Sequence, residues 1–303
     1  MKYFLGLLAF ITFLSSCKKN VHKTSAQKNS IQQTGIKNKP VKRVDTSAMV
    51  YFKGGTFTMG SNDRTPIEAP AYETTTAPYY LDVNLVTVAD FRKFIEATNY
   101  VTEAENFGDS GVFNFKSYRW MLIKGATWEY PFGINAPKAE DNHPVTHVSW
   151  NDANIYAKWI GKRLPTEKEF EFASKNDKNL KYPWGNTVLK EGKIMANTWD
   201  GNSIENQNVK DGYLFTSPVG SYPKSESEIN DLVGNVWQWT STTFAPHNKN
   251  IPFNIDNSIV VTKGGSFMYD DALKLSYTNT FRAQNSKETS LFNIGFRCAK
   301  SDK

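Results

Sequence analysis

A pair of adjacent glycines near the carboxyl end of the chain constrains the fold more than any other feature. Residues 263–269 read Lys-Gly-Gly-Ser-Phe-Met-Tyr, and residues 293–299 carry the related series Asn-Ile-Gly-Phe-Arg-Cys-Ala. Two glycines before a serine and an aromatic residue indicate a backbone that turns tightly or lies close to another segment. The 303 residues contain 19 Gly and 13 Pro, and helical periodicity is sparse. This pattern predicts an irregular, loop-rich α+β fold with low regular secondary structure.

Three further motifs precede these two series. They are Gly-Lys-Arg-Leu-Pro-Thr-Glu at residues 161–167, Tyr-Pro-Trp-Gly at residues 182–185 and Val-Gly-Asn-Val-Trp-Gln-Trp at residues 233–239. Together the five motifs resemble the formylglycine-generating, sulfatase-modifying factor (FGE-sulfatase) family, from about Val50 to Ala299. The resemblance implies a C-type-lectin-like fold. We assign a single domain to residues 47–303, because no linker or repeat interrupts this part of the chain.

The first residues carry the signals of an exported lipoprotein. Lys2 gives a short positive region, and residues 4–14 form an apolar stretch that is too short to span a bilayer. Leu-Ser-Ser-Cys at residues 14–17 resembles a bacterial lipobox. We expect residues 1–16 to be a lipoprotein signal peptide and Cys17 to be lipidated; an ordinary cleaved signal with an incidental cysteine is the alternative. The protein is then expected in the bacterial cell envelope, anchored by lipid to the outer membrane and facing the periplasm.

Residues 17–46 are predicted to form a basic, flexible tether, because they are polar and almost free of aromatic residues. Nine of the chain's 36 basic residues lie at or before Arg43, and no acidic residue precedes Asp45. The rest of the chain has 27 basic and 30 acidic residues, a formal charge of −3. This balance argues against nucleic-acid binding by the folded part. The tether either adheres to an anionic lipid surface or is a solvated spacer.

The chain lacks the reactive thiols of the family that it resembles. There, two cysteines after the Gly-Gly-Ser series bind Cu(I) and convert a substrate cysteine to formylglycine. The corresponding positions here are Tyr269 and Lys274, and neither is a soft ligand for Cu(I). Copper and formylglycine generation by that mechanism are therefore not expected. The family's usual partner for the late cysteine, Cys298, is replaced by Ala157, so we predict no disulfide and a buried Cys298.

The resemblance also implies a peptide groove, ringed here by Trp237, Ser266, Tyr269 and Arg282. Tyr269 is flanked by two aspartates and could donate a proton or sense a ligand. The simpler interpretation is an exposed tyrosine that fills the vacated groove, because aromatic side chains are good rigid anchors for binding.

Two structural calcium sites are implied by the same resemblance, since calcium prefers side-chain and backbone oxygens. The first site maps onto Asn197, Thr198, Asp211 and Tyr213, and the second maps onto Asp231, Gly234, Val236 and Gln238. Gln238 replaces a family glutamate and removes a charge, which Asp231 can restore. The alternative is that hydrogen bonds alone close these loops.

A non-haem iron site, as in related sulfoxide synthases, is the other metal chemistry to consider. It needs a cluster of histidine and carboxylate ligands. His143 and His147 lie four residues apart, but Pro144 forbids a shared helix face, so they could share a side only in a strand. Packing is the favoured interpretation of both. His247 lies in a polar loop with no predicted partner.

Capping residues and apolar spacing predict three helices. Residues 86–95 contain a Thr cap at Thr87, residues 151–161 follow Trp150, and residues 167–173 follow a Leu-Pro-Thr entry signal. Residues 49–60 are expected to form two short strands around a turn, and residues 143–150 a short strand.

The leading hypothesis is a membrane-anchored, non-catalytic lipoprotein whose domain binds a peptide or protein partner in the cell envelope. It is similar in this respect to lipoproteins of gliding and secretion machinery. The alternative is an oxidoreductase of the sulfatase-modifying or non-haem iron type that acts through a different ligand set.

Overall fold

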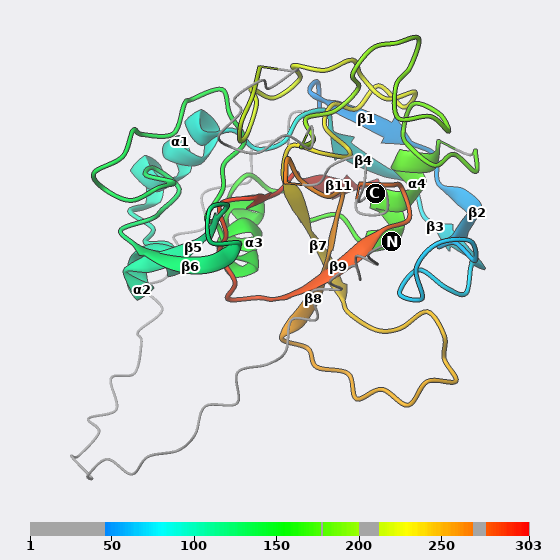
Figure 1. Ribbon diagram of the computed structural model, residues 1–303. Coiled ribbons are helices and arrows are strands. Elements are labelled where there is room, and N and C mark those ends of the chain that lie inside the picture. The colour runs from blue at the N-terminus through cyan, green and yellow to red at the C-terminus, as the bar shows by residue number, and fades with distance from the viewer. Residues whose placement is uncertain (1–45, 177, 200–211, 269–276, 303) are drawn as a thin grey trace, which may run out of the picture. The chain divides into compact units, whose positions relative to one another are not determined.

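Four short helices and eleven short strands, joined by long loops, make up the described part of the chain (Figure 1). The computed structural model describes residues 46–176, 178–199, 212–268 and 277–302, which lie in a unit that runs from residue 41 to residue 303. The helices are α1 (Val88–Thr98), α2 (Glu103–Phe107), α3 (Trp150–Trp159) and α4 (Glu167–Lys175). The strands are β1 (Met49–Phe52), β2 (Gly55–Met59), β3 (Tyr72–Thr76), β4 (Tyr79–Asp82), β5 (Asp109–Asn114), β6 (Arg119–Lys124), β7 (Trp237–Thr243), β8 (Ile259–Lys263), β9 (Arg282–Ser286), β10 (Ile294–Gly295) and β11 (Ala299–Ser301). This confirms the predicted α+β class. None of the helices in these ranges is long and apolar enough to cross a membrane.

The strands form two larger sheets and two isolated pairs. The first sheet has the order β1-β4-β11 and the second the order β10-β7-β8-β9, while β2 pairs with β3 and β5 pairs with β6. Because β11 lies antiparallel to β4, the last described strand completes the sheet that the first strand begins. The two strands predicted in residues 49–60 are β1 and β2, but each pairs with a later strand and not with the other.

Each helix begins at a serine or threonine whose hydroxyl accepts a hydrogen bond from a backbone N–H of the first turn. Thr87 caps α1 and Thr166 caps α4, as predicted. At α4, the Glu169 carboxylate accepts a hydrogen bond from the backbone N–H of the cap residue and completes a capping box. Local sequence therefore fixes where these helices start.

The prediction of a strand at residues 143–150 is wrong. The described backbone there makes one isolated bridge, between Thr87 and Pro144, before α3 begins. Proline has no N–H to donate, and His147 has a φ of 56°, so a regular ladder cannot continue through this segment.

The largest hydrophobic cluster lies between α1, α3 and the second sheet. The ring of Phe91 stacks on Tyr156 at 5.7 Å, and Trp239 and Phe296 are fully buried beside them. Cys298 ends in this cluster as a free and fully buried thiol, as predicted. Burial raises the pKa of the Cys298 thiol well above its ordinary value, so the group stays protonated and unreactive.

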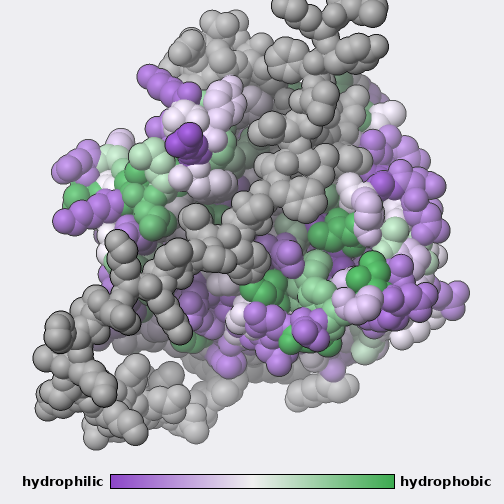
Figure 2. All heavy atoms as spheres, turned by 60° about the horizontal axis from the view of Figure 1, so that its bottom comes forward, coloured by the Kyte–Doolittle hydropathy of each residue, from purple (hydrophilic) through white to green (hydrophobic). Residues whose placement is uncertain are grey.

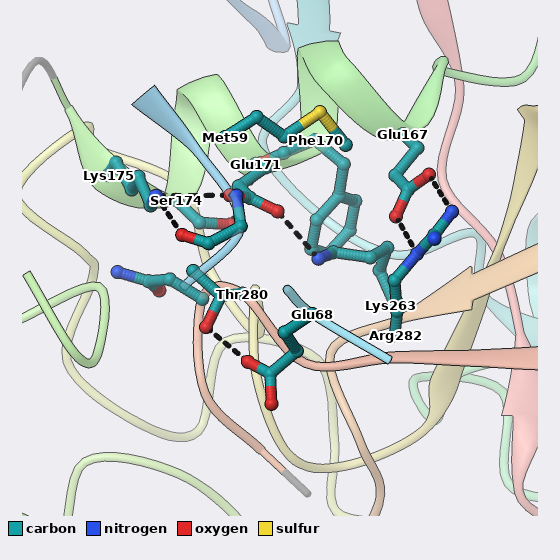
Figure 3. A network of polar contacts seen from close by, with 12 residues as sticks. Met59, Glu68, Glu167, Phe170, Glu171, Ser174, Lys175, Lys263, Thr280 and Arg282 are labelled. Atoms are coloured by element: carbon teal, nitrogen blue, oxygen red, sulfur yellow. Dashed lines mark hydrogen bonds and ion pairs between the residues drawn. The ribbon is translucent and has the colours of Figure 1, made fainter. Parts of the chain in front are cut away.

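Buried ion pairs hold α4 against the second sheet. Glu167 accepts two hydrogen bonds of 2.7 Å from Arg282, and Glu171 lies 3.0 Å from Lys263. The two glutamates are four residues apart and point from one side of α4, whereas Lys263 and Arg282 are directly opposite each other on β8 and β9 (Figure 3). The helix repeat and the strand register thus place two anions over two cations.

Glu171 is fully buried and has two cationic neighbours. Its carboxylate accepts hydrogen bonds from Lys263 at 3.0 Å and from the Gly60 N–H at 2.6 Å, and Lys175 lies 3.0 Å away. Burial alone would raise the pKa of Glu171, but the two lysines and the Gly60 N–H hold it below its ordinary value. The folded state therefore favours the ionised carboxylate, and removing one lysine leaves a buried charge less well compensated.

We expect Lys263→Met to lower the free energy of unfolding at pH 7 by about 3–5 kcal/mol, the usual cost of breaking a buried ion pair. The control is Lys93→Met, which removes the exposed Lys93–Asp90 pair and should change stability by about 0–1 kcal/mol. Urea unfolding measures both. Equal effects of the two substitutions would contradict this account.

The same pair gives stability a pH dependence of definite sign. Because the folded-state pKa of Glu171 is depressed, its contribution is complete above the ordinary value of 4.5 and is lost as the pH falls through the folded-state pKa. Lys263→Met should reduce this acid-dependent loss, which urea unfolding at several acidic pH values would detect.

Candidate functional site

The Gly-Gly-Ser segment follows β8 and turns sharply away from it. Gly264 has a φ of 93° and Gly265 a φ of 71°, both in the left-handed region that favours glycine. A Cβ atom on Gly264 would lie 2.7 Å from the carbonyl oxygen of Leu232. The predicted tight turn and close approach are therefore both present, and any larger residue at position 264 would push the turn away from the 231–236 loop.

Asn235 connects this turn to two other loops. Its backbone carbonyl accepts from the Phe267 N–H at 3.0 Å, and its backbone N–H donates to the Asn197 carbonyl at 2.8 Å. Its side-chain amide accepts from the Ser217 N–H and donates to the Ser217 carbonyl, both at 3.1 Å. Asn235 has a φ of 57°, a conformation that asparagine tolerates better than most residues. One residue thus joins two loops to the Gly-Gly-Ser turn.

Aromatic rings extend from this turn to the protein surface. Phe267 packs on Phe292 at 5.2 Å, and Phe292 in turn contacts Trp120 of β6 at 5.6 Å. We call the partly exposed rings around these two phenylalanines the aromatic surface. Its members are Phe113, Phe115, Trp120, Phe132 and Phe215. Because each ring contacts another member, the surface is held in place by aromatic packing.

The β5–β6 hairpin adds exposed aliphatic side chains beside these rings. Leu122 is 72% exposed and Trp120 is 45% exposed, and Met121 and Tyr118 are also exposed. Figure 2 shows hydrophobic side chains at the surface on the side where Figure 1 draws β5 and β6. A group of large apolar side chains at one place on a surface is typical of a binding site.

Three of the predicted groove residues are described, and they do not line this surface. Ser266 is fully buried and accepts a hydrogen bond from the Asn293 amide at 3.1 Å. Trp237 is buried with its ring 6.0 Å from Phe281, and Arg282 is buried in its pair with Glu167. Their side chains therefore belong to the core. Tyr269, the fourth predicted groove residue, lies outside the described residues, as does Lys274.

The aromatic surface was missed at the level of sequence. The sequence feature that could have indicated this surface is the run of apolar residues in positions 113–123, where Phe-Asn-Phe precedes Tyr-Arg-Trp-Met-Leu-Ile across a short turn. Such a hairpin has the composition of a buried strand pair, and sequence alone does not tell that one of its strands stays exposed.

The histidines do not assemble a metal centre in the described ranges, where no group of three His, Cys, Asp or Glu side chains could hold an ion. His147 is fully buried, and its Nδ1 lies 2.8 Å from the Ser110 hydroxyl. Burial lowers the pKa of His147 to about 3, so the ring is neutral. His143 bonds the Thr216 hydroxyl, and His247 lies 3.0 Å from the Glu68 carbonyl. Packing is thus the interpretation that these contacts favour.

The first predicted calcium site passes a chemical test of fit. Asn197 is buried; its Nδ2 donates to the Phe215 carbonyl at 2.7 Å, but its Oδ1 has no hydrogen-bond partner among the described residues. A buried acceptor without a donor is unfavourable unless a cation or water meets it. Asn197, Thr198 and Tyr213 would hold calcium here through oxygens, and the ion would join the two loops. Asp211 lies outside the described residues.

The contacts at the second predicted site do not fit a calcium ion. Gln238 donates its Nε2 to the Asp231 carbonyl at 2.8 Å and accepts from Arg297 Nε at 2.7 Å through its Oε1. Arg297 also donates to the Asp231 carbonyl at 2.8 Å. Both polar atoms of the Gln238 amide are therefore already hydrogen-bonded, and its oxygen is directed at Arg297, so Gln238 cannot offer the oxygen that an ion held by Asp231, Gly234, Val236 and Gln238 would need.

The fold and this site define a loop-rich α+β domain built around a Gly-Gly-Ser turn. The profile of the FGE-sulfatase family, the sulfatase-modifying factor enzyme 1-like domain, matches residues 33–302, and the chain belongs to this family. The predicted resemblance is confirmed.

Relatives and solved structures agree with this assignment. The chain is 39% identical over 276 residues to the formylglycine-generating enzyme of Mus musculus, covering 83% of this chain and 74% of the relative. It is 37% identical over 273 residues to the inactive C-alpha-formylglycine-generating enzyme 2 of the same species, covering 84% and 86%. The fold is similar to that of PvdO from Pseudomonas aeruginosa, with a TM-score of 0.63 and 25% identity over 84% of this chain and 94% of that one.

If calcium binds at the first site, a chelator should lower the melting temperature of the wild-type protein, because the ion binds only the folded loops. Asn197→Ala removes the unpartnered Oδ1 and should abolish this chelator response. Asn230→Ala removes an amide that bonds Asn84 near the surface and should keep the response. Thermal unfolding with and without chelator gives the result, and a wild-type curve that does not move with chelator would contradict the site.

Proposed function

We propose that the protein is a lipid-anchored, non-catalytic member of the FGE-sulfatase family whose domain binds a peptide or protein partner in the cell envelope. The observation that carries this proposal is the aromatic surface with the exposed β5–β6 side chains next to it. It lies beside the Gly-Gly-Ser turn, the segment after which the family places its reactive cysteines.

The chemistry of the chain supports binding without turnover. No cysteine occurs between residues 18 and 297, so no thiolate pair is available near the turn, and Cys298 is a buried, protonated thiol. One of the relatives is itself named an inactive formylglycine-generating enzyme, so membership in the family does not by itself imply catalysis.

The physical properties of the aromatic surface suit a protein partner. Rigid rings present large apolar area and lose little conformational freedom on binding, which is why aromatic residues are common at interface centres. Charged side chains of Arg119, Lys124 and Asp109 lie on the same hairpin, so an apolar centre has a polar rim. Apolar residues of an extended peptide or of a protein surface would be buried against this centre.

The lipid anchor is part of the same proposal and rests on the sequence, since residues 1–45 lie outside the described residues. Acylation of Cys17 would hold the domain at the outer membrane, facing the periplasm, within reach of envelope proteins. The mass of the mature amino terminus tests it: an acylated Cys17 agrees, and an unmodified terminal amine on another residue contradicts it.

The partner-binding proposal is tested by two matched substitutions of exposed aliphatic residues. Leu122→Asp places a charge on the exposed hairpin, whereas Ile255→Asp does so at another residue that is 65% exposed. The wild-type protein is used to enrich binding proteins from solubilised envelopes. We expect Ile255→Asp to enrich the same proteins to the same degree, whereas Leu122→Asp should lower their enrichment about tenfold, which corresponds to a loss of about 1.4 kcal/mol in binding free energy. Quantitative mass spectrometry measures the enrichment.

Thermal unfolding of both variants provides the control for folding. Because Leu122 and Ile255 are exposed, both variants should melt close to the wild-type temperature. Equal retention of all proteins by the two variants would show that the aromatic surface is not the binding site.

A further inference from the structure

The turn from Asp231 to Gln238 needs a specific source of stabilisation. Asp231, Gly234 and Asn235 have φ values of 50°, 76° and 57°, three left-handed residues within five positions. Such conformations are unfavourable for residues other than glycine and persist only where surrounding contacts impose them. Something in the buried environment of this turn must therefore fix the direction of its carbonyl groups.

Two buried side chains supply the donors. Arg297 donates through Nη2 to the carbonyls of Asn230 at 2.7 Å and Asp231 at 2.8 Å. Gln238 donates through Nε2 to the carbonyls of Asp231 at 2.8 Å and Leu232 at 3.4 Å. Both side chains are fully buried. Three successive carbonyls thus converge on nitrogen donors, in the way that carbonyls converge on a bound cation.

Arg297 fixes the orientation of the Gln238 amide. The Nε of Arg297 lies 2.7 Å from one terminal atom of Gln238, and a guanidinium can only donate, so that atom must be the acceptor Oε1. The other terminal atom is then Nε2, which faces the Asp231 and Leu232 carbonyls. The orientation of the amide follows from its hydrogen-bond partners and not from its shape.

A glutamate at this position would give the opposite chemistry with the same shape. One carboxylate oxygen would still accept from Arg297, but the other would face two carbonyl oxygens with no hydrogen between them. This arrangement of acceptors is favourable only when a cation lies among them. Replacing that oxygen by an NH₂ group converts the repulsion into two hydrogen bonds.

We propose that the side-chain amide of Gln238 takes the structural role of a second calcium ion, so that the turn at residues 231–238 is closed by hydrogen bonds and binds no metal. The Nε2 end of the amide and the guanidinium of Arg297 together satisfy the carbonyls of Asn230, Asp231 and Leu232. The inference does not depend on the proposed partner binding, because it concerns only how this turn is held.

The test is the calcium stoichiometry of three proteins, measured by isothermal titration with calcium alone. Gln238→Glu should bind one calcium ion more than the wild type, and its melting temperature should rise with calcium by more than that of the wild type. Asp231→Asn should keep the wild-type stoichiometry, because its side chain can still accept the hydrogen bond that the Gly220 N–H donates at 2.8 Å. Any calcium bound at the first predicted site is common to all three proteins and cancels from the comparison.

A third variant separates the role of the amide from that of the metal. Gln238→Met keeps the approximate volume but removes both hydrogen-bonding atoms, so it should melt at a lower temperature than the wild type to the same extent in calcium and in chelator. The proposal would be overturned by a wild-type protein that loses one bound calcium on Asp231→Asn. It would also be overturned by a folded Gln238→Glu that gains none, or by Gln238→Met with the wild-type melting temperature.

Discussion

The structure depends on side chains that satisfy backbone hydrogen-bonding groups where no sheet or helix does so. Between α4 and β7, the described residues 178–199 and 212–236 contain neither a helix nor a strand. A buried loop is stable only if its N–H and C=O groups find partners. Asn235 and Gln238 provide them through amides, and Arg297 provides them through its guanidinium. Burial lowers the pKa of Arg297 to about 10, which still leaves it charged at neutral pH.

This mode of stabilisation explains how the domain can keep its fold without the family's reactive groups. The contacts that hold the Gly-Gly-Ser turn come from Asn235, from the Gly234 N–H that donates to the Gly264 carbonyl, and from the core around Phe267, and none of them needs a thiol or a bound metal. The buried Glu171–Lys263 and Glu167–Arg282 ion pairs hold β8, the strand that precedes this turn, and β9 against α4. Under the proposed function, such a scaffold presents a binding surface without the family's chemistry, since fold and function are separable.

Sequence reasoning predicted those features that depend on neighbouring residues. Thr87 and Thr166 marked helix starts because an N-cap acts within one turn, and Gly264 and Gly265 marked a turn because only glycine takes those φ values easily. The burial of Arg282 was not predicted, because it follows from the packing of β9 under α4 and the position of Glu167, which no local pattern reports.

The two predicted calcium sites also show that local sequence does not report contacts between distant residues. Asn197 and Gln238 are both side-chain amides, yet the Asn197 oxygen has no partner among the described residues, whereas both polar atoms of Gln238 are bonded. The difference comes from Arg297, which is 59 positions after Gln238 in the chain and contacts it only in the folded state. The exposure of β6 is likewise set by what packs around it and not by its own residues.

The central claim, that this family member does not catalyse the reaction of its relatives, is tested most directly by incubating the purified protein with a cysteine-containing sulfatase-type peptide, with and without copper. Mass spectrometry of the peptide measures conversion of cysteine to formylglycine, and the mouse formylglycine-generating enzyme serves as the positive control. The account predicts no loss of sulfur from the peptide, because Tyr269 and Lys274 stand where a soft thiolate pair is required. Copper-dependent conversion by the unmodified protein would contradict the account.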